Sequence, residues 1–128
     1  ELTVDISEET FIRDIAPART FGFLRDIEKM RANGLAKGGS LENAIVIGDE
    51  GVLNDSGLRF SDEFVRHKIL DAVGDFALLG LPILGHIFCE KAGHTANSNF
   101  LKKLLSSPDC YEVVTDVENE LPVAVNFS

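Results

Sequence analysis

The chain has 128 residues, of which 45% are hydrophobic and 26% charged, a composition typical of one globular domain and not of a disordered or fibrous protein. Its formal net charge of −9 argues against a general nucleic-acid binder, because such proteins need a basic face. No apolar run approaches the ~18 residues of a membrane span, and neither Cys89 nor Cys110 has a CxxC partner. We therefore expect no transmembrane segment and no disulfide framework, with both cysteines as small apolar fillers in a reducing cytoplasm.

The first residues are predicted to form a strand and then a helix. Residues 2–6, LTVDI, alternate between apolar and polar side chains, as a strand does. Ser7 is a favourable N-cap, and the two glutamates after it suit the positive end of a helix dipole. This helix should end near Ala16, because Pro17 disfavours a helical conformation in the residue before it. Since the chain lacks an initiator Met, we expect it to begin partway into a longer protein.

The middle of the chain alternates short elements and turns. Residues 18–23, ARTFGF, are expected to form a tight connection. Residues 23–33 carry apolar side chains at helical spacing, and Gly34 is a natural stop for that helix. After the flexible KGGS, the β-rich residues 43–48 predict a strand, and two turn sequences flank a short strand at 52–53.

A longer helix opens the second half of the chain. Ser61 is its expected N-cap, two acidic residues follow in the first turn, and the helix should end near Gly80. Residues 81–90, LPILGHIFCE, are expected to form a strand, and residues 91–99, KAGHTANSN, a polar loop. The amphipathic residues 100–107 should form a short helix that the following proline ends.

Residues 111–117 and 121–127 are predicted as two further strands that close the chain. Short links join all these elements, and we find no internal repeat, low-complexity tract or long linker. Helices and strands thus mix without regular β-α-β alternation. This order predicts an α+β fold, a two-layer sandwich in which a small sheet packs against helices.

The predicted long helix carries a row of ionisable side chains. His67, Asp71 and Asp75 lie four residues apart on one side of it, since each such step turns the direction by only about 40°. Their neighbours are mostly apolar, so the row must face something polar, and Gly74 beside it leaves room for a ligand. His and Asp one turn apart can bind one metal ion, although a catalytic zinc site usually has three protein ligands. The alternative is a solvated face, or a His–Asp pair within a packed helix.

A second candidate group centres on His94, which lies in the Gly-flanked KAGHTAN with Lys91 nearby. A loop histidine on a rigid scaffold is a usual catalytic arrangement, and Asp75 can serve as its orienting carboxylate. The alternative for this residue is an ordinary surface histidine. His86 lies in an apolar run and is expected to be structural, and Thr20 can either assist an oxyanion or cap the next helix.

Four segments, in this order, resemble the zinc-dependent UDP-3-O-acyl-N-acetylglucosamine deacetylases of lipid A biosynthesis in Gram-negative bacteria. They are ARTFGFLRDIE, GLAKGGSLENAIVI, LRFSDEFVRHKILDAVGD and KAGHTANSNFLKKLL. The resemblance is to the C-terminal part of that enzyme and covers nearly the whole chain. It implies that residues 1–128 are a segment of the C-terminal catalytic domain, that the N-terminal domain is absent from this chain, and that the reaction is hydrolysis of an N-acetyl group with release of acetate in the cytoplasm.

The resemblance also implies residue roles. His67 and Asp71 would be two ligands of Zn²⁺, while the third ligand and the glutamate base would come from the N-terminal domain. Zinc makes a water nucleophilic near neutral pH and polarises the amide carbonyl. His94 would be the general acid with Asp75 as its partner, and the Thr20 hydroxyl would stabilise the tetrahedral oxyanion.

Substrate contacts follow from the same resemblance. Lys68 would contact the UDP-linked acylated glucosamine, and Lys91 would attract its phosphates. An inserted β-α-β unit at about residues 20–52 would form an apolar passage for the fatty acyl chain. Its implied contact positions are Phe21, Ile27, Leu41 and Val46. Leu41 replaces an aromatic residue found in some members, and ordinary core packing is the alternative for the aliphatic positions.

A non-catalytic domain, separated from its N-terminal half and serving as a folding unit or a binding surface, is the rival interpretation. The catalytic interpretation requires a particular geometry. His67 and Asp71 should converge, and Asp75 should point toward His94. It also makes the missing N-terminal half the partner of this chain.

Overall fold

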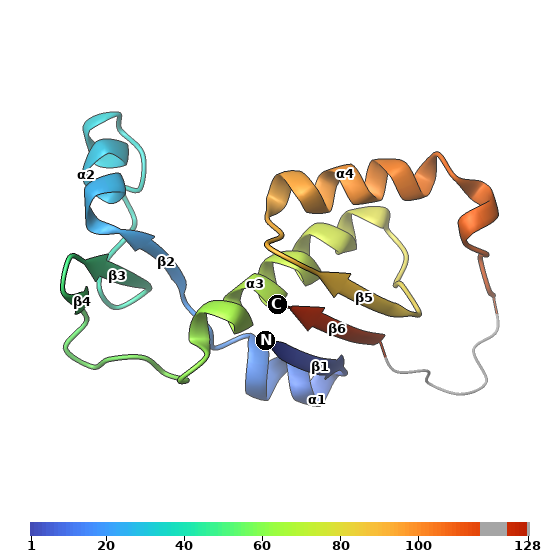
Figure 1. Cartoon of the computed structure of the whole chain (residues 1–128), viewed down its shortest axis with the longest axis horizontal. Coiled ribbons are helices and arrows are strands. Elements are labelled where there is room, and N and C mark those ends of the chain that lie inside the picture. Colours follow the sequence, from blue (N-terminus) through green and yellow to red (C-terminus); the bar gives the residue numbers. More distant parts are fainter. Residues whose placement is uncertain (116–122, 128) are drawn as a thin grey trace.

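The computed structural model describes residues 1–115 and the backbone of residues 123–127 (Figure 1). Its strands are β1 (Leu2–Ile6), β2 (Thr20–Phe23), β3 (Ala44–Gly48), β4 (Gly51–Val52), β5 (His86–Cys89) and β6 (Val123–Phe127). Its helices are α1 (Glu8–Thr10), α2 (Leu24–Ala32), α3 (Glu63–Phe76) and α4 (His94–Leu105), with a π turn η1 (Phe11–Ile15) and 3-10 turns η2 (Ala77–Leu79) and η3 (Pro108–Cys110). This mixture confirms the α+β prediction.

The larger body is a sheet in the order β1-β6-β5 packed against helices. Strand β6 runs antiparallel to β1 and parallel to β5. Figure 1 shows α3 and α4 next to each other along this sheet. The buried side chains between the two layers form one cluster, made of Ile15, Ile69, Ala72, Phe76, Cys89 and Leu101. The body thus has the predicted two layers.

A β-α-β unit over residues 20–52 projects from this body (Figure 1). Strand β2 pairs in parallel with β3, and β4 pairs antiparallel with β3. The tight connection predicted locally for residues 18–23 is wrong, because pairing with the distant β3 makes most of it a strand. Helix α2 packs directly over Gly22 of that strand, since an added Cβ would meet Ile27 Cγ1 at 3.4 Å, an ordinary van der Waals contact.

The other elements of the unit lie near their predicted places. Helix α2 ends at Ala32, and Gly34 has a φ of +76°, as expected of a glycine that terminates a helix. Strand β3 falls within residues 43–48, and β4 begins one residue before the predicted 52–53.

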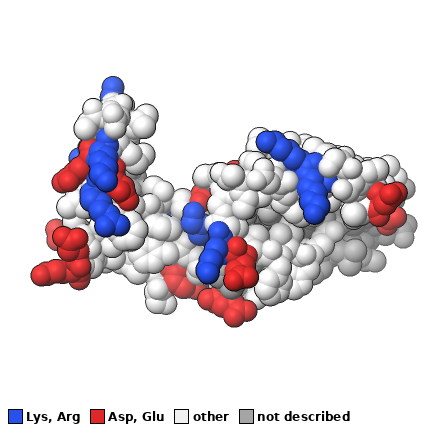
Figure 2. All heavy atoms as spheres, turned by 45° about the horizontal axis from the view of Figure 1, so that its top comes forward, with Lys and Arg blue, Asp and Glu red and all other residues white. Residues whose placement is uncertain are grey.

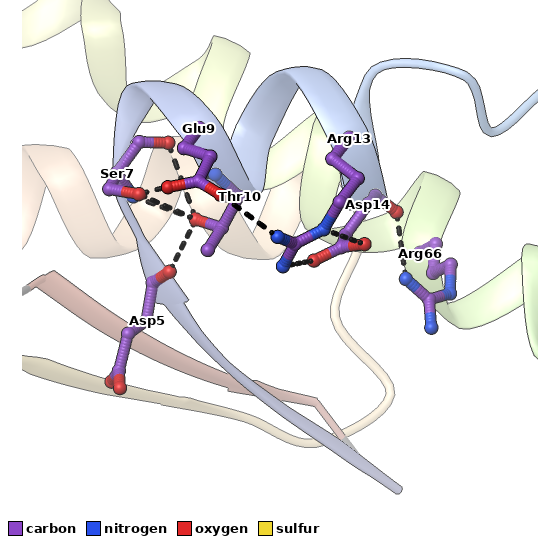
Figure 3. A network of polar contacts seen from close by, with 7 residues as sticks. All are labelled: Asp5, Ser7, Glu9, Thr10, Arg13, Asp14 and Arg66. Atoms are coloured by element: carbon purple, nitrogen blue, oxygen red, sulfur yellow. Dashed lines mark hydrogen bonds and ion pairs between the residues drawn. The ribbon is translucent and has the colours of Figure 1, made fainter.

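The helical segment after β1 begins as predicted and is tied to α3 (Figure 3). Ser7 caps it, because the Thr10 backbone N–H donates to the Ser7 hydroxyl at 3.2 Å. The segment widens into the π turn η1, whose C-cap is Ala16, the predicted end. Arg66 on α3 donates from Nη1 to the Asp14 carbonyl at 2.9 Å, which attaches the turn to the helix that carries the candidate site.

Helix α3 begins one residue later than predicted. Its N-cap is Asp62 and not Ser61. The Asp62 carboxylate makes no capping bond, because it accepts from Arg66 Nε at 2.6 Å instead. The α-helix ends at Phe76 and continues as η2, and Gly80 then adopts a φ of +76°, close to the predicted end.

The prediction of a polar loop at residues 91–99 is wrong from His94 onward. His94 is the first residue of α4, with Gly93 as the N-cap, so this helix starts six residues before the predicted residues 100–107. The buried residues of α4 are Asn97 and Leu101, which lie on one face four positions apart. Because Asn97 is polar, the spacing of apolar residues in the sequence does not reveal that this face is buried.

Strand β5 is shorter than predicted, since its pairing with β6 spans only His86–Cys89 of residues 81–90. His86 is exposed on it, and its ring centroid lies 5.9 Å from that of Phe88. Cys89 is buried, and burial raises the pKa of its thiol, which keeps it protonated. Cys110 is exposed, so the prediction of an apolar filler is wrong there.

The strand predicted at 111–117 is absent from its described part, because residues 111–115 are irregular and exposed, and residues 116–117 lie outside the described ones. Strand β6 falls within the predicted 121–127. Within the described part of the chain, no helix has the length and apolar character needed to cross a membrane.

Candidate metal and acid–base site

The ionisable row on α3 has four members in the structure and not three. Glu63, His67, Asp71 and Asp75 follow at intervals of four residues, and each makes a polar contact. Sequence reasoning placed Glu63 in the first turn of the predicted helix and gave it no further role. Its spacing from His67 was the signal that could have added it to the row.

His67 and Asp71 converge, as the catalytic interpretation requires. His67 Nε2 lies 3.3 Å from Asp71 Oδ1, and both side chains are mostly buried. The other ring nitrogen, Nδ1, lies 3.1 Å from the Ala18 carbonyl oxygen. A carbonyl only accepts hydrogen bonds, so Nδ1 carries a proton and donates it to Ala18, and Nε2 is the ring nitrogen that faces Asp71. Lys68 Nζ lies 3.5 Å from the second Asp71 oxygen.

This pair fits two positions of a zinc site. Ligand atoms at about 2.1 Å from a tetrahedral zinc are roughly 3.4 Å apart, close to the separation of His67 and Asp71. The backbone carbonyl on Nδ1 is also the usual partner of a metal-binding imidazole. Among the described residues, no group of three or more His, Cys, Asp and Glu side chains could hold a metal ion. The described residues thus offer two donors of the three that catalytic zinc normally has.

The second group joins α3 to α4. His94 Nδ1 lies 2.8 Å from Asp75 Oδ2 and 3.1 Å from Oδ1. The Asn97 side-chain amide donates to the same Oδ2 at 2.8 Å, and Asn97 itself is buried. Burial opposes ionisation of Asp75, but the hydrogen bonds from Asn97 and then His94 outweigh it and lower its pKa. Asp75 is therefore a fixed carboxylate beside the His94 ring, as predicted, and Asn97 is a partner that sequence reasoning missed.

The surroundings of His94 favour its protonated form. The hydrogen bond to Asp75, then the charges of Asp75 and Asp71, raise the pKa of its imidazole. Its side chain is 69% exposed, so the ring can reach a bound reactant. A protonated histidine held through Nδ1 can donate a proton from Nε2, which is the task of a general acid.

Glu63 anchors the segment before β2 to α3. Its fully buried carboxylate accepts from Arg19 Nε at 2.9 Å, Arg19 Nη2 at 3.1 Å and the Arg19 backbone N–H at 3.0 Å. The Arg59 backbone N–H adds a bond of 2.6 Å. Burial opposes ionisation, but these donors and the Arg19 charge outweigh it and lower the pKa of Glu63 to about 2.

An apolar pocket of about 480 Å³ lies within the β-α-β unit. Four predicted contact residues line it together with Thr20, namely Phe21, Ile27, Leu41 and Val46. Phe21 also links the pocket to α3, since its ring packs edge-on against His67 and Phe64 with centroids 6.2 Å and 4.8 Å apart. Lys68 Nζ lies 5.6 Å from the centre of the same ring. The structure thus brings the apolar contact residues together in one pocket. Phe21 connects this pocket to His67.

The remaining predicted positions are less enclosed. Lys91 is exposed, and its φ of +48° is uncommon for a non-glycine residue. No atom lies within 4 Å of an added Cβ at Gly74, so the expected room beside the row exists. On the face drawn in Figure 2, basic side chains lie in separate groups over the projecting unit, near the middle of the molecule and over α4, and acidic side chains lie beside the first two groups.

Comparisons with known proteins agree with the resemblance. The family model described as UDP-3-O-acyl N-acetylglycosamine deacetylase matches residues 1–106. Curated proteins named UDP-3-O-acyl-N-acetylglucosamine deacetylase are 58% identical over 115 residues in Syntrophotalea carbinolica, 54% over 118 in Myxococcus xanthus and 49% over 122 in Acidithiobacillus ferrooxidans. These matches cover 90%, 92% and 95% of this chain, but only 37%, 38% and 40% of the relatives. The chain thus spans about two fifths of the length of these relatives.

Proposed function

Because the chain belongs to the UDP-3-O-acyl N-acetylglycosamine deacetylase family, we propose that it is the C-terminal part of a zinc-dependent deacetylase. The complete protein would hydrolyse the N-acetyl group of a UDP-3-O-acyl-N-acetylglucosamine and release acetate, in the cytoplasm of a Gram-negative bacterium and as a step of lipid A biosynthesis. The observation that carries the proposal is the 3.3 Å approach of His67 Nε2 to Asp71 Oδ1, one turn before the Asp75–His94 pair.

His67 and Asp71 would hold the Zn²⁺ ion, and the N-terminal half would supply the third ligand and the general base. Bound zinc would supply Lewis acidity toward the amide carbonyl and lower the pKa of water. The Ala18 carbonyl would hold the His67 ring in the tautomer that a metal requires.

His94 would donate a proton to the leaving amine nitrogen, while Asp75 and Asn97 hold its ring in place. Thr20 lines the edge of the apolar pocket and is exposed, so its hydroxyl would be accessible to donate to the developing oxyanion. Removal of one such donor typically lowers turnover about 10²–10³-fold.

The unit at residues 20–52 would bind the fatty acyl chain, because its pocket is apolar and Phe21, which lines it, also contacts His67. Lys68 and Lys91 would attract the nucleotide phosphates. The net charge of −9 is compatible with this, since a phosphate site needs only a few nearby cations.

The test uses two proteins, the chain alone and a completed protein in which the chain is fused to the uncovered N-terminal part of the Syntrophotalea carbinolica relative. Zinc is measured by mass spectrometry, and acetate release is measured with the UDP-sugar substrate. We expect weak zinc binding and no activity from the chain alone, because the described residues offer two zinc ligands and the general base is assigned to the N-terminal half. The completed protein should bind one zinc and release acetate.

A His67→Ala variant of the completed protein should lose both zinc and activity. His86→Ala is the matched control, since that histidine lies on β5 outside the row. Tight, stoichiometric zinc in the chain alone would contradict the assignment of two ligands. A zinc-loaded completed protein without deacetylation would favour the rival interpretation of a non-catalytic module.

A further inference from the structure

Glu63 has no role in the proposed chemistry, although it belongs to the same row on α3. Among the described residues, Glu63 and Arg19 are the charged residues whose exposure falls to 6% or below. Removing two charges from water is unfavourable, and a protein with an apolar pair of similar size in their place is often equally stable. A buried ion pair therefore calls for an explanation in terms of the arrangement that it imposes.

The pair holds one short segment against α3. Three bonds from Arg19 to the Glu63 carboxylate include its own backbone N–H, so they fix the main chain as well as the side chain. Arg19 Nη2 also donates to the Gly57 carbonyl at 2.8 Å, and the Arg59 backbone N–H reaches Glu63. The segments on both sides of the β-α-β unit are thus attached to the first residue of α3.

The residues on either side of Arg19 are those that the site needs. Ala18 before it presents the carbonyl that lies 3.1 Å from His67 Nδ1. Thr20 after it begins β2 and lines the apolar pocket. Glu63 and His67 lie one helical turn apart, so one stretch of main chain meets both on the same face of α3.

We propose that Glu63 is a positioning residue, which through Arg19 holds the Ala18 carbonyl against His67 and so keeps the Nε2 atom of His67 directed at Asp71. This inference rests on the proposed function for its link to zinc, while the arrangement itself involves only residues of this chain. His67 and Asp71 can bind one metal together only if Nε2 is directed at the metal, and the hydrogen bond from Nδ1–H to the Ala18 carbonyl fixes the ring in that orientation.

The first test examines His67 in the metal-free chain by long-range ¹H–¹⁵N NMR of the histidine rings, which distinguishes the two tautomers. The wild-type ring should carry a proton on Nδ1, where the Ala18 carbonyl accepts it. Glu63→Gln should give a mixture of tautomers, because the amide that replaces one carboxylate oxygen cannot accept from the N–H donors around it. Arg19→Lys should give a smaller shift in the same direction, because Lys keeps the charge but loses the fork of donors.

Glu9→Gln is the matched control, since it removes the same kind of group from the exposed pair that Glu9 forms with Arg13 at 3.1 Å. It should leave the His67 tautomer unchanged. A wild-type His67 without a proton on Nδ1 overturns the proposal without any variant. The proposal is also overturned if the protonation of the His67 ring nitrogens is unchanged in either variant that folds. Arg19→Lys is expected to fold even if Glu63→Gln does not.

The second test measures zinc affinity of the completed protein by chelator competition. Partners that orient a metal ligand typically contribute 10–100-fold to affinity, so Glu63→Gln and Arg19→Lys should bind zinc about 10-fold more weakly or worse. Glu9→Gln should bind it normally. If the folded variants bind zinc with wild-type affinity, the Glu63–Arg19 pair has a purely structural role and the proposal is overturned. Absence of deacetylation in the wild-type completed protein would refute the proposed function alone, because the tautomer and zinc measurements do not depend on turnover.

Discussion

Asp75 on α3 holds His94, the first residue of α4, through a hydrogen bond of 2.8 Å between Oδ2 and Nδ1. The start of α4 makes this geometry possible, because Asn97 follows three residues later and its amide reaches the same oxygen. The acid–base pair is therefore built across a helix–helix contact and is not carried by a loop.

Replacing His94 by Ala in the completed protein should lower turnover by about 10²–10⁴-fold, the usual contribution of a general acid or base. Zinc content should stay nearly unchanged, because this histidine pairs with Asp75 and not with the His67–Asp71 pair. Steady-state kinetics and metal analysis of the same preparation check both parts. Loss of zinc along with activity would instead identify His94 as a metal ligand.

Asp75→Asn should lower the pKa of His94, since the hydrogen bond to Asp75 and its charge are the main causes of the raised value. The wild-type His94 stays protonated to higher pH than an ordinary histidine, and its contribution to folding stability is lost as pH rises through that raised pKa. NMR titration of the His94 ring in the chain alone should show the variant midpoint at lower pH. A midpoint that stays or rises would contradict the assigned pair.

Glu63 should remain ionised until the pH falls to about 2. A carboxylate with a lowered pKa stabilises the fold above the pKa of the unfolded chain and loses this contribution as pH falls through the folded value. The window here runs from about pH 4.5 to about pH 2, and the contribution is roughly 3 kcal/mol. Carbon-detected NMR of the Glu63 carboxylate gives the midpoint, and urea unfolding across this window gives the free energy. A midpoint above 4.5 would contradict the buried pair.

Leu41→Phe should make the completed protein favour shorter acyl chains, because the larger ring would fill part of the apolar pocket. Each methylene displaced from the pocket should cost about 0.8 kcal/mol, or about fourfold in kcat/KM. A series of substrates that differ in acyl length measures this. Leu78→Phe is the control, since Leu78 is 78% exposed and does not line the pocket. An equal loss of kcat/KM for substrates of every acyl length would show that the pocket does not hold the acyl chain.

Local patterns predicted several elements because their causes lie within a few residues. Ser7 as an N-cap, Gly34 after α2 and the row on α3 all depend on neighbours in the chain. The strand β2 was missed because its sequence includes a glycine and becomes extended only through pairing with β3. The start of α4 was missed because a polar residue, Asn97, occupies its buried face and has its partner on α3.

By itself, the sequence determined which side chains share one face of α3, since helical periodicity is a local property of the backbone, and its motifs indicated the family. Only the tertiary structure decided what each member of that row meets. Glu63 pairs with Arg19 from 44 residues away, and Asp75 pairs with His94 from 19 residues away. Such partners are chosen by packing, because a charge that is shielded from water must find its hydrogen bonds wherever the folded chain supplies them.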